Sequence, residues 1–212
     1  MKTKVNVKRI ISAFLTALLL AVSLIGCEKD EKELTPMEKA KELFNVSEEY
    51  SKMTLEVNTF TGGVTLSSSY TLTREGDGLK VNYSVQVLST FDVTDNGIEL
   101  PEGEFVRTVS GIASVNGTQV SHQSGELCPY DLSGMTFPSF TVNENTVQIN
   151  TLEQGSINIV VTDPKTFFGT DGDIGSNVTV QGSYSEDRLD RLSFSATVSD
   201  GSSYTVRMNF TK

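Results

Sequence analysis

The sequence has no tryptophan and a single histidine among its 212 residues. Without tryptophan it lacks the usual stacking platform for sugar rings, so its many carboxylates do not favour a glycoside hydrolase. The one histidine, His122, excludes a zinc helix with two histidines, and no Gly-x-Ser-x-Gly elbow supplies a nucleophile for it to activate. Its neighbours Ser121, Gln123 and Ser124 are typical of a solvated strand end. We therefore expect no catalytic residues, no cofactor and no enzymatic activity.

Complete metal-binding motifs are missing as well. Asp171-Gly172-Asp173 and Asp92 with Asp95-Asn96 place oxygen ligands in loops. A full calcium loop also requires glycine at its sixth position and glutamate at its twelfth, and neither loop provides this pattern. Because Asp, Asn and Gly are the ordinary residues of turns, both loops are interpreted as turns and no metal site is expected.

Apolar runs long enough to cross a membrane are also lacking. The run from Ile10 to Ile25 has no charged residue, but a transmembrane helix requires about 20 apolar residues. This run is shorter and contains Ser12, Thr16 and Ser23. Its end, Leu24-Ile25-Gly26-Cys27, fits poorly the small-x-small cleavage site of an ordinary signal peptide. The run follows a cationic start formed by Lys2, Lys4, Lys8 and Arg9.

The stretch from Lys2 to Cys27 resembles the signal of bacterial lipoproteins, which ends in a lipobox. The resemblance implies that residues 1–26 are a lipoprotein signal peptide and that the Cys27 thiol carries a diacylglyceryl group as a thioether. Small Gly26 then leaves the bond before Cys27 accessible to the dedicated peptidase. The implied location is the bacterial cell envelope, with the domain outside the cytoplasm and held to the membrane by the lipid on Cys27.

The mature chain implied by this resemblance is strongly acidic. The signal holds 4 of the 17 basic residues and none of the 27 acidic ones, so the mature chain has 13 basic residues and a net charge of −14. This charge disfavours nucleic acid as a partner, because phosphate binding needs clustered Lys and Arg. It also disfavours an anionic bilayer surface, so the lipid is expected to hold the protein there. Residues 27–35 form a charged tether, similar in composition to the acidic segment of some surface-exported Bacteroidetes lipoproteins.

The sequence has two cysteines, Cys27 and Cys128. If Cys27 is lipidated, Cys128 has no partner within the chain, which excludes a disulfide framework and a thiolate zinc cluster. Leu127, Pro129 and Tyr130 surround Cys128 in the sequence. This setting favours a small buried apolar residue over a reactive thiol or an intermolecular bond.

Helical signals occur immediately after the tether. Thr35-Pro36-Met37-Glu38 combines a capping hydroxyl, proline at the first helical position and glutamate at the third. Apolar residues then recur at steps of three or four, so the pattern predicts an amphipathic helix from Pro36 to about Tyr50. The apolar stripe consists of Met37, Ala40, Leu43, Phe44, Val46 and Tyr50.

From Met53 onward the apolar period changes to two, which is typical of strands with one wet face. Met53 to Leu88 is predicted to be a three-stranded antiparallel meander that turns at Gly62-Gly63 and at Glu75–Gly78. Phe91 to Glu104 is interpreted as a long loop or a short hairpin. Gln123 to Asn145, with Pro129, Gly134 and Pro138, is interpreted as a loop that covers something apolar, and Asp163 to Gly169 as one helical turn.

About nine strands and one helix are predicted in total. A hairpin is expected at Asn116-Gly117 and another at Asp200-Gly201. The strands after the meander are Phe105 to Val109, Ile112 to Val115, Val147 with Ile149, Ile157 to Val161, Val178 to Tyr184, Leu192 to Val198 and Tyr204 to Phe210.

The predicted fold is mainly β, with one N-terminal amphipathic helix packed on an antiparallel meander in a single domain of residues 36–212. The helix Pro36 to Tyr50, the meander Met53 to Leu88 and the closing hairpin Leu192 to Phe210 resemble the LolA-like and LppX-like lipoprotein-carrier superfamily. This resemblance implies a half-barrel that holds the helix and binds acyl chains in its concave face. The LppX-like branch fits better, because LolA itself is not lipidated. A β-sandwich and a lipocalin-like barrel are the alternative architectures.

Two functions fit this pattern. The first is a lipid-anchored extracytoplasmic binding or carrier protein for an apolar small molecule or lipid. The second is a structural or adhesive surface domain with a filled core and no ligand. An alternating pattern serves a cavity and a filled core equally well, so both stay open. The hypothetical ligand-binding residues are Leu43, Phe44, Val46, Tyr50, Tyr83, Val85, Met208 and Phe210.

Overall fold

The computed structural model describes residues 34–46, 50–61, 63–89, 94–95, 98–99, 106–169, 177–197 and 201–212. The chain divides into two compact units, Met1–Leu34 and Thr35–Lys212. The expected signal peptide, Cys27 and nearly all of the charged tether lie outside the described residues. The fold below is therefore that of the unit Thr35–Lys212.

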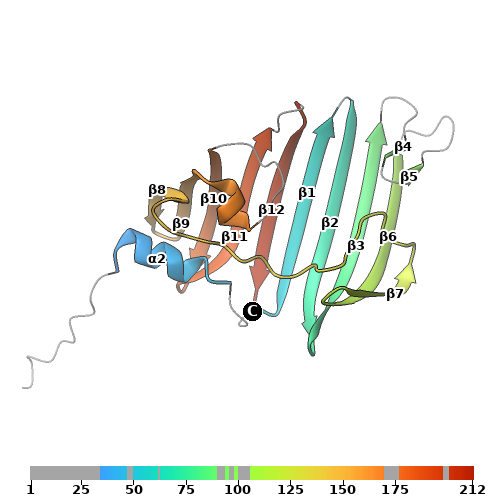
Figure 1. Ribbon diagram of the computed structural model, residues 1–212, viewed down its shortest axis with the longest axis horizontal. Helices are drawn as coiled ribbons and strands as arrows, with labels where there is room; N and C mark the ends of the chain where they lie inside the picture. Colours follow the sequence, from blue (N-terminus) through green and yellow to red (C-terminus); the bar gives the residue numbers. More distant parts are fainter. Residues whose placement is uncertain are drawn as a thin grey trace, which may run out of the picture. The chain divides into compact units, whose positions relative to one another are not determined.

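Within the described residues, ten strands form one antiparallel sheet, and two short strands form a separate hairpin. The sheet order is β7-β6-β3-β2-β1-β12-β11-β10-β9-β8, so the first and last strands pair in the middle and the sheet is not closed (Figure 1). The small hairpin consists of β4 (Thr94–Asp95) and β5 (Ile98–Glu99). The large sheet consists of β1 (Lys52–Thr61), β2 (Val64–Glu75), β3 (Gly78–Ser89), β6 (Val106–Asn116), β7 (Gln119–Gly125), β8 (Val147–Glu153), β9 (Ser156–Val161), β10 (Val178–Ser185), β11 (Arg188–Thr197) and β12 (Ser203–Thr211).

The mainly β class and the antiparallel meander predicted from the sequence are confirmed. β1, β2 and β3 pair in register from Lys52 to Ser89, and β6 turns into β7 at Gly117, whose φ is +57°. The alternatives of a two-sheet sandwich and a closed lipocalin-like barrel do not describe this single open sheet.

Two strand predictions were wrong in detail. The sequence predicted two strands, Phe105 to Val109 and Ile112 to Val115, with a break at Ser110-Gly111. The structure has one strand, β6, through both segments, because Gly111 keeps its pairing with Tyr83 of β3. His122 was predicted to be a solvated strand-end residue; it is exposed, but it lies inside β7 and pairs with Ala113. All residues of β7 are exposed, so this strand has no apolar alternation from which it could be recognised.

The first helix, α2 (Pro36–Leu43), begins where the sequence predicts. The Thr35 hydroxyl accepts a hydrogen bond from the Glu38 N–H at 3.2 Å, and the Glu38 carboxylate accepts one from the Thr35 N–H at 2.9 Å. The predicted end at Tyr50 was wrong, since Phe44 is the C-cap and the next residues, Asn45 and Val46, favour helices weakly. No helix in the described part of the chain is long and apolar enough to cross a membrane.

The sheet has one apolar face, which we call the inner face. Cross-strand register places Val85 opposite Val109 and Ser68, Ser68 opposite Val57, and Val57 opposite Val206. Side chains on this face make up most of the buried core. Its cover includes α2, the short helix α3 (Pro164–Phe168) and residues 126–146, which we call the strap.

The strap connects β7 to β8, the two edges of the sheet, by crossing the inner face (Figure 1). Leu132, Phe137 and Val142 of the strap are buried in the core. The covering loop predicted over Gln123 to Asn145 is therefore present, although its first three residues belong to β7.

Candidate functional site

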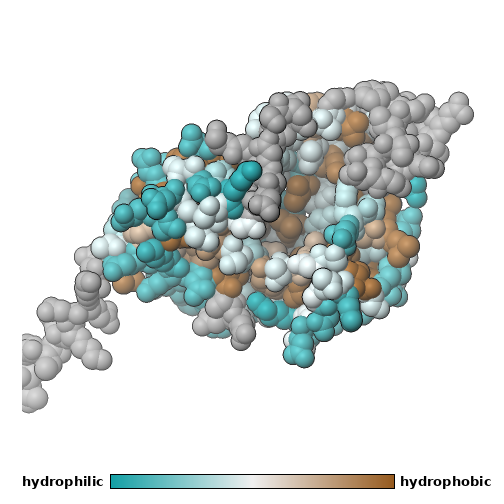
Figure 2. Space-filling model, in the orientation of Figure 1, coloured by the Kyte–Doolittle hydropathy of each residue, from teal (hydrophilic) through white to brown (hydrophobic). Residues whose placement is uncertain are grey.

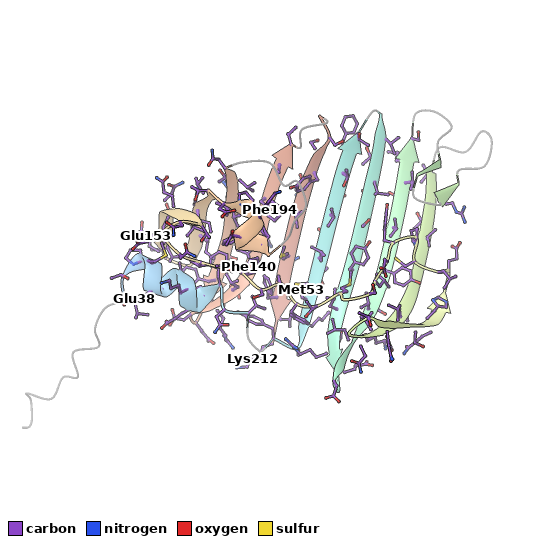
Figure 3. The ribbon with its side chains drawn as sticks, viewed as in Figure 1. Glu38, Met53, Phe140, Glu153, Phe194 and Lys212 are labelled. Carbon is purple, nitrogen blue, oxygen red and sulfur yellow. The ribbon has the colours of Figure 1, made fainter. Side chains whose placement is uncertain are left out.

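Aromatic side chains fill the inner face near α2 and α3. The Phe44 ring lies 5.5 Å from that of Phe140 and 5.6 Å from that of Phe167, and Phe168 lies 4.7 Å from Phe194, measured between centroids. Figure 3 labels Phe140 of the strap and Phe194 of β11 in this region. Leu43 and Phe44, two of the hypothetical ligand-binding residues, are each 1 % exposed. They contribute to a filled core in this structure.

An arginine joins the segment after α2 to the strap. The Arg74 Nε donates to the Tyr50 carbonyl oxygen at 2.9 Å, and its guanidinium lies 4.4 Å from the Phe137 ring centroid. The Tyr50 ring in turn lies 5.5 Å from that of Phe210 on β12. Tyr50 and Phe210 are thus brought together, as contacts between buried side chains.

A polar cluster marks the start of the strap. The Tyr83 hydroxyl donates to the backbone oxygen of Glu126 at 2.5 Å and lies 3.3 Å from His122 Nδ1. The other ring nitrogen of His122 lies 3.2 Å from the Gly125 oxygen. The Glu126 carboxylate pairs with Arg107 at 3.4 Å. These contacts fix the point at which the chain leaves the sheet edge and turns over the inner face.

A small pocket of about 140 Å³ adjoins this cluster and is lined by Tyr83, His122 and Cys128, among others. Burial raises the pKa of the Cys128 thiol and that of the Tyr83 hydroxyl above their usual ranges. Burial also raises the pKa of Tyr70 on β2 to about 12. A half-buried thiol kept protonated is a poor nucleophile, which agrees with the apolar role expected for Cys128.

The middle of the inner face is less completely covered than its flanks. Val81, Val85 and Val87 of β3 are fully buried, whereas Leu55 and Val57, inward-facing side chains of the central strand β1, are only half-buried. Figure 2 shows a hollow over the middle of this face with hydrophobic side chains at its floor, where Figure 1 places β1 and β2. We call this feature the central recess and define it by the half-buried residues Leu55, Val57, Leu66 and Tyr204.

The eight hypothetical ligand-binding residues do not converge on one place. Tyr83 and Val85 lie on β3, whereas Met208 and Phe210 lie on β12, with β1 and β2 between them. Val46 lines a separate cleft of about 260 Å³ together with Phe44 and Phe140. Sequence reasoning placed Leu55, Val57 and Leu66 on strand faces but did not single them out. The missing information was the sheet order, which puts β1 at the centre.

Acidic side chains occur in an open cleft of about 650 Å³ between the β2–β3 and β6–β7 turns. Glu75 and Asp77 line it together with Asn116 and Gln119. Across the described residues, no three His, Cys, Asp or Glu side chains are grouped so as to hold a metal ion. The Asp171 and Asp92 loops of the sequence analysis lie outside the part whose side chains the structure describes.

Gly111 offers a direct test of the polar cluster. An added Cβ would lie 2.7 Å from the backbone oxygens of both Glu126 and Ser124 and would also meet the Tyr83 hydroxyl. We expect Gly111→Ala to lower the free energy of unfolding by about 1 to 3 kcal/mol, a typical overpacking cost. Urea titration measures this. Ser110→Ala, at an exposed position of the same strand, is the matched control, and equal losses in both variants would contradict the close approach at Gly111.

Comparison with known proteins assigns no family to this chain. No family model and no curated protein matches the chain. Among solved structures, this chain is similar to a redesigned β-barrel, mFAP1, bound to DFHBI, with 13% sequence identity. The match covers 74% of this chain and 91% of that chain, and its TM-score is 0.19. A second redesigned β-barrel, mFAP0, also bound to DFHBI, is 14% identical in sequence. That match covers 76% of this chain and 96% of the other, and its TM-score is 0.21. TM-scores this low carry no functional argument, so function is argued from the geometry of the chain itself.

Proposed function

We propose that this protein is a lipid-anchored extracytoplasmic binding protein that takes up an apolar or acyl ligand in the central recess. One observation carries the proposal: inward-facing apolar side chains at the very centre of the sheet, Leu55 and Val57, are half-buried. A filled core would bury its central residues first, as it does Val81 and Val85 two strands away.

The chemistry of the recess fits an apolar ligand. Leu55, Val57 and Leu66 present hydrocarbon, and the inward-facing positions of β1 and β12 from Met53 to Thr61 and from Tyr204 to Phe210 carry no charge. Each methylene that a ligand buries contributes about 0.8 kcal/mol. An acyl chain is therefore the ligand class that gains most from this surface.

The strap is the natural cover for such a ligand. Its two ends are attached by the Tyr83–Glu126 hydrogen bond and by the Thr146 backbone oxygen, which accepts a hydrogen bond from the Thr162 N–H at 2.9 Å. Between them, Phe137 lies under Arg74 and the Gly134 N–H donates to the Gly117 oxygen at 2.8 Å. These attachments keep the strap across the sheet while the recess stays accessible beside it.

Filling the recess tests the proposal. In the unit Thr35–Lys212, Val57→Trp is expected to weaken binding of the fluorescent fatty acid cis-parinaric acid at least tenfold, because the indole would occupy the ligand's place. Fluorescence titration gives the dissociation constant. Asn58→Trp, at the exposed neighbouring position that faces away, is expected to change it less than twofold. Equal effects of both substitutions would remove the recess as the binding site.

The alternative, a structural or adhesive surface domain with a filled core, draws support from the aromatic cluster of Phe44, Phe140 and Phe167. The same titration separates the two functions. If the wild-type unit bound no acyl probe below the critical micelle concentration of the probe, the result would favour the alternative function, a structural or adhesive surface domain.

A further inference from the structure

The large sheet has two edge strands, β8 and β7, at its opposite ends (Figure 1). Helix α2 lies against β8, and the register of β8 with β9 shifts between Ile149 and Thr151. β7 pairs with β6 alone, and all of its residues, Gln119–Gly125, are exposed. β7 contains no lysine and no proline, although natural edge strands often carry these residues to prevent pairing. β7 is therefore the edge that is more open to another strand.

The register shows which backbone groups of β7 an added strand would meet. A two-residue turn separates Asn116 from Gln119, so these two residues form a hydrogen-bonded pair of the β6–β7 ladder. Bonded and non-bonded pairs alternate along an antiparallel ladder. Val120 and His122 therefore direct their N–H and C=O groups away from β6. Within the described part of the chain, none of the turn and loop hydrogen bonds uses these groups.

A small, mainly apolar pocket lies beside these two residues. Val120 and His122 line it together with Leu127 of the strap, and its volume is about 140 Å³. Leu127 is 73 % exposed and Val120 44 %, so both have apolar surface left to bury. Pockets for small molecules usually have volumes of about 300 Å³ or more, so this one fits a single aliphatic side chain better than a free ligand. Val120 and His122 align with inward-facing Val115 and Ala113, on the side of the sheet that the strap covers.

The turn end of β7 borders the acidic cleft. Glu75 and Asp77 line this cleft of about 650 Å³ together with Val120, which also lines the small pocket. Lys80 contacts Glu75 at 3.9 Å, and the side chains of this pair are 36 % and 54 % exposed. A long surface ion pair of this kind is weak. A strand added along β7 would thus pass from an aliphatic pocket to carboxylates that basic side chains complement.

We propose that Val120 and His122 of β7 form a docking edge for an extended basic segment of a partner protein, which adds to the sheet as an antiparallel strand. An aliphatic side chain of the segment lies opposite His122 and enters the small pocket. A lysine or arginine two residues later lies opposite Val120, beside Glu75 and Asp77. Main-chain hydrogen bonds give such a complex its affinity, and the alternating side chains give its specificity. The inference is independent of the central recess.

Fluorescence anisotropy of a labelled peptide tests the docking edge. The probe is a seven-residue threonine peptide with isoleucine at its third position and lysine at its fifth and sixth, and it is titrated with the full chain in phosphatidylcholine nanodiscs. We expect it to bind at least tenfold more tightly than analogues with serine in place of isoleucine or glutamate in place of lysine. N-methylation of its third and fifth residues should abolish binding, because those nitrogens face β7. Absence of binding up to about 1 mM protein would overturn the proposal.

A proline on β7 tests strand pairing from the side of the protein. Val120→Pro removes an N–H that points away from β6, so the β6–β7 ladder is kept. It should weaken binding of the isoleucine–lysine peptide at least tenfold. Val120→Thr is the matched control, because it keeps this N–H, and it should change binding less than threefold. Equal losses in the two variants would contradict strand addition, and circular dichroism of each excludes unfolding as the cause.

Charge and the identity of the occupant are tested separately. Asp77→Asn should weaken binding of the isoleucine–lysine peptide severalfold, whereas Glu153→Gln, at an exposed position of the opposite edge strand β8, should leave it unchanged. Equal effects would show attraction by net charge alone and would contradict docking at β7. Sedimentation of the wild-type chain as a dimer that Val120→Pro dissociates would show that a second copy occupies the edge, and would overturn the basic partner.

Discussion

Replacing Phe167 by alanine is expected to lower the free energy of unfolding by about 3 to 5 kcal/mol, the usual cost of deleting a buried phenyl ring. Phe167 is fully buried. Its ring lies 5.6 Å from Phe44, 5.3 Å from Phe140 and 4.8 Å from Phe168. One side chain therefore joins the end of α2, the strap and α3. Urea denaturation followed by circular dichroism measures the loss.

Phe60→Ala is the matched control, because Phe60 on β1 is 55 % exposed. An exposed ring contributes little to the core, so the change in unfolding free energy should stay within about 0.5 kcal/mol. A loss at Phe60 as large as that at Phe167 would contradict the contrast between a buried ring of the aromatic cluster and an exposed ring of the sheet.

Much of this fold can be predicted from local pattern. Alternation from Met53 to Leu88 correctly gives three strands, because an antiparallel meander needs only neighbours in sequence and short turns. Thr35 and Glu38 correctly give the start of α2, since a capping box is a local structure. Its end was harder to predict, because Phe44, Val46 and Tyr50 continue the apolar spacing after the backbone has left the helix.

The open sheet and its strap depend on long-range pairing that no local pattern encodes. β1 and β12 are neighbours in the middle of the sheet although they are the first and last strands of the chain. Alternation shows that Val57 and Val206 each have a buried face, but not that they lie opposite one another. For the same reason, the predicted set joined Tyr83 and Val85 to Met208 and Phe210 as one site.

The site itself was less predictable than the fold because it depends on incomplete cover. Leu55 and Val81 have the same place in the alternation, yet Val81 is fully buried and Leu55 is half-buried. The difference depends on which elements cover each strand, and the alternation of a strand does not contain that information.

The other large effect concerns the anchor. Cys27→Ser is expected to abolish lipid attachment completely and to leave the precursor uncut. In the bacterial lipoprotein signal that residues 1–27 resemble, the Cys27 sulfur forms a thioether with the diacylglyceryl group, and this bond must form before the peptidase acts. A hydroxyl is a much weaker nucleophile than a thiolate, so serine cannot replace the cysteine. Metabolic labelling with an alkynyl fatty acid and intact-mass measurement would give an unlabelled chain that still begins at Met1.

Cys128→Ser is the matched control for the Cys27→Ser experiment. Cys128 is the other cysteine of the chain, and burial raises the pKa of its thiol, so removing it should leave labelling and processing unchanged. If the lipid label instead followed Cys128, the fatty acid would be attached within the folded domain beside Tyr83 and His122. A Cys27→Ser chain that was still cut and still partitioned into detergent would contradict the lipoprotein anchor. The proposed binding of acyl ligands in the central recess would remain testable in either case, because Leu55 and Val57 belong to the unit Thr35–Lys212, which forms its own compact body.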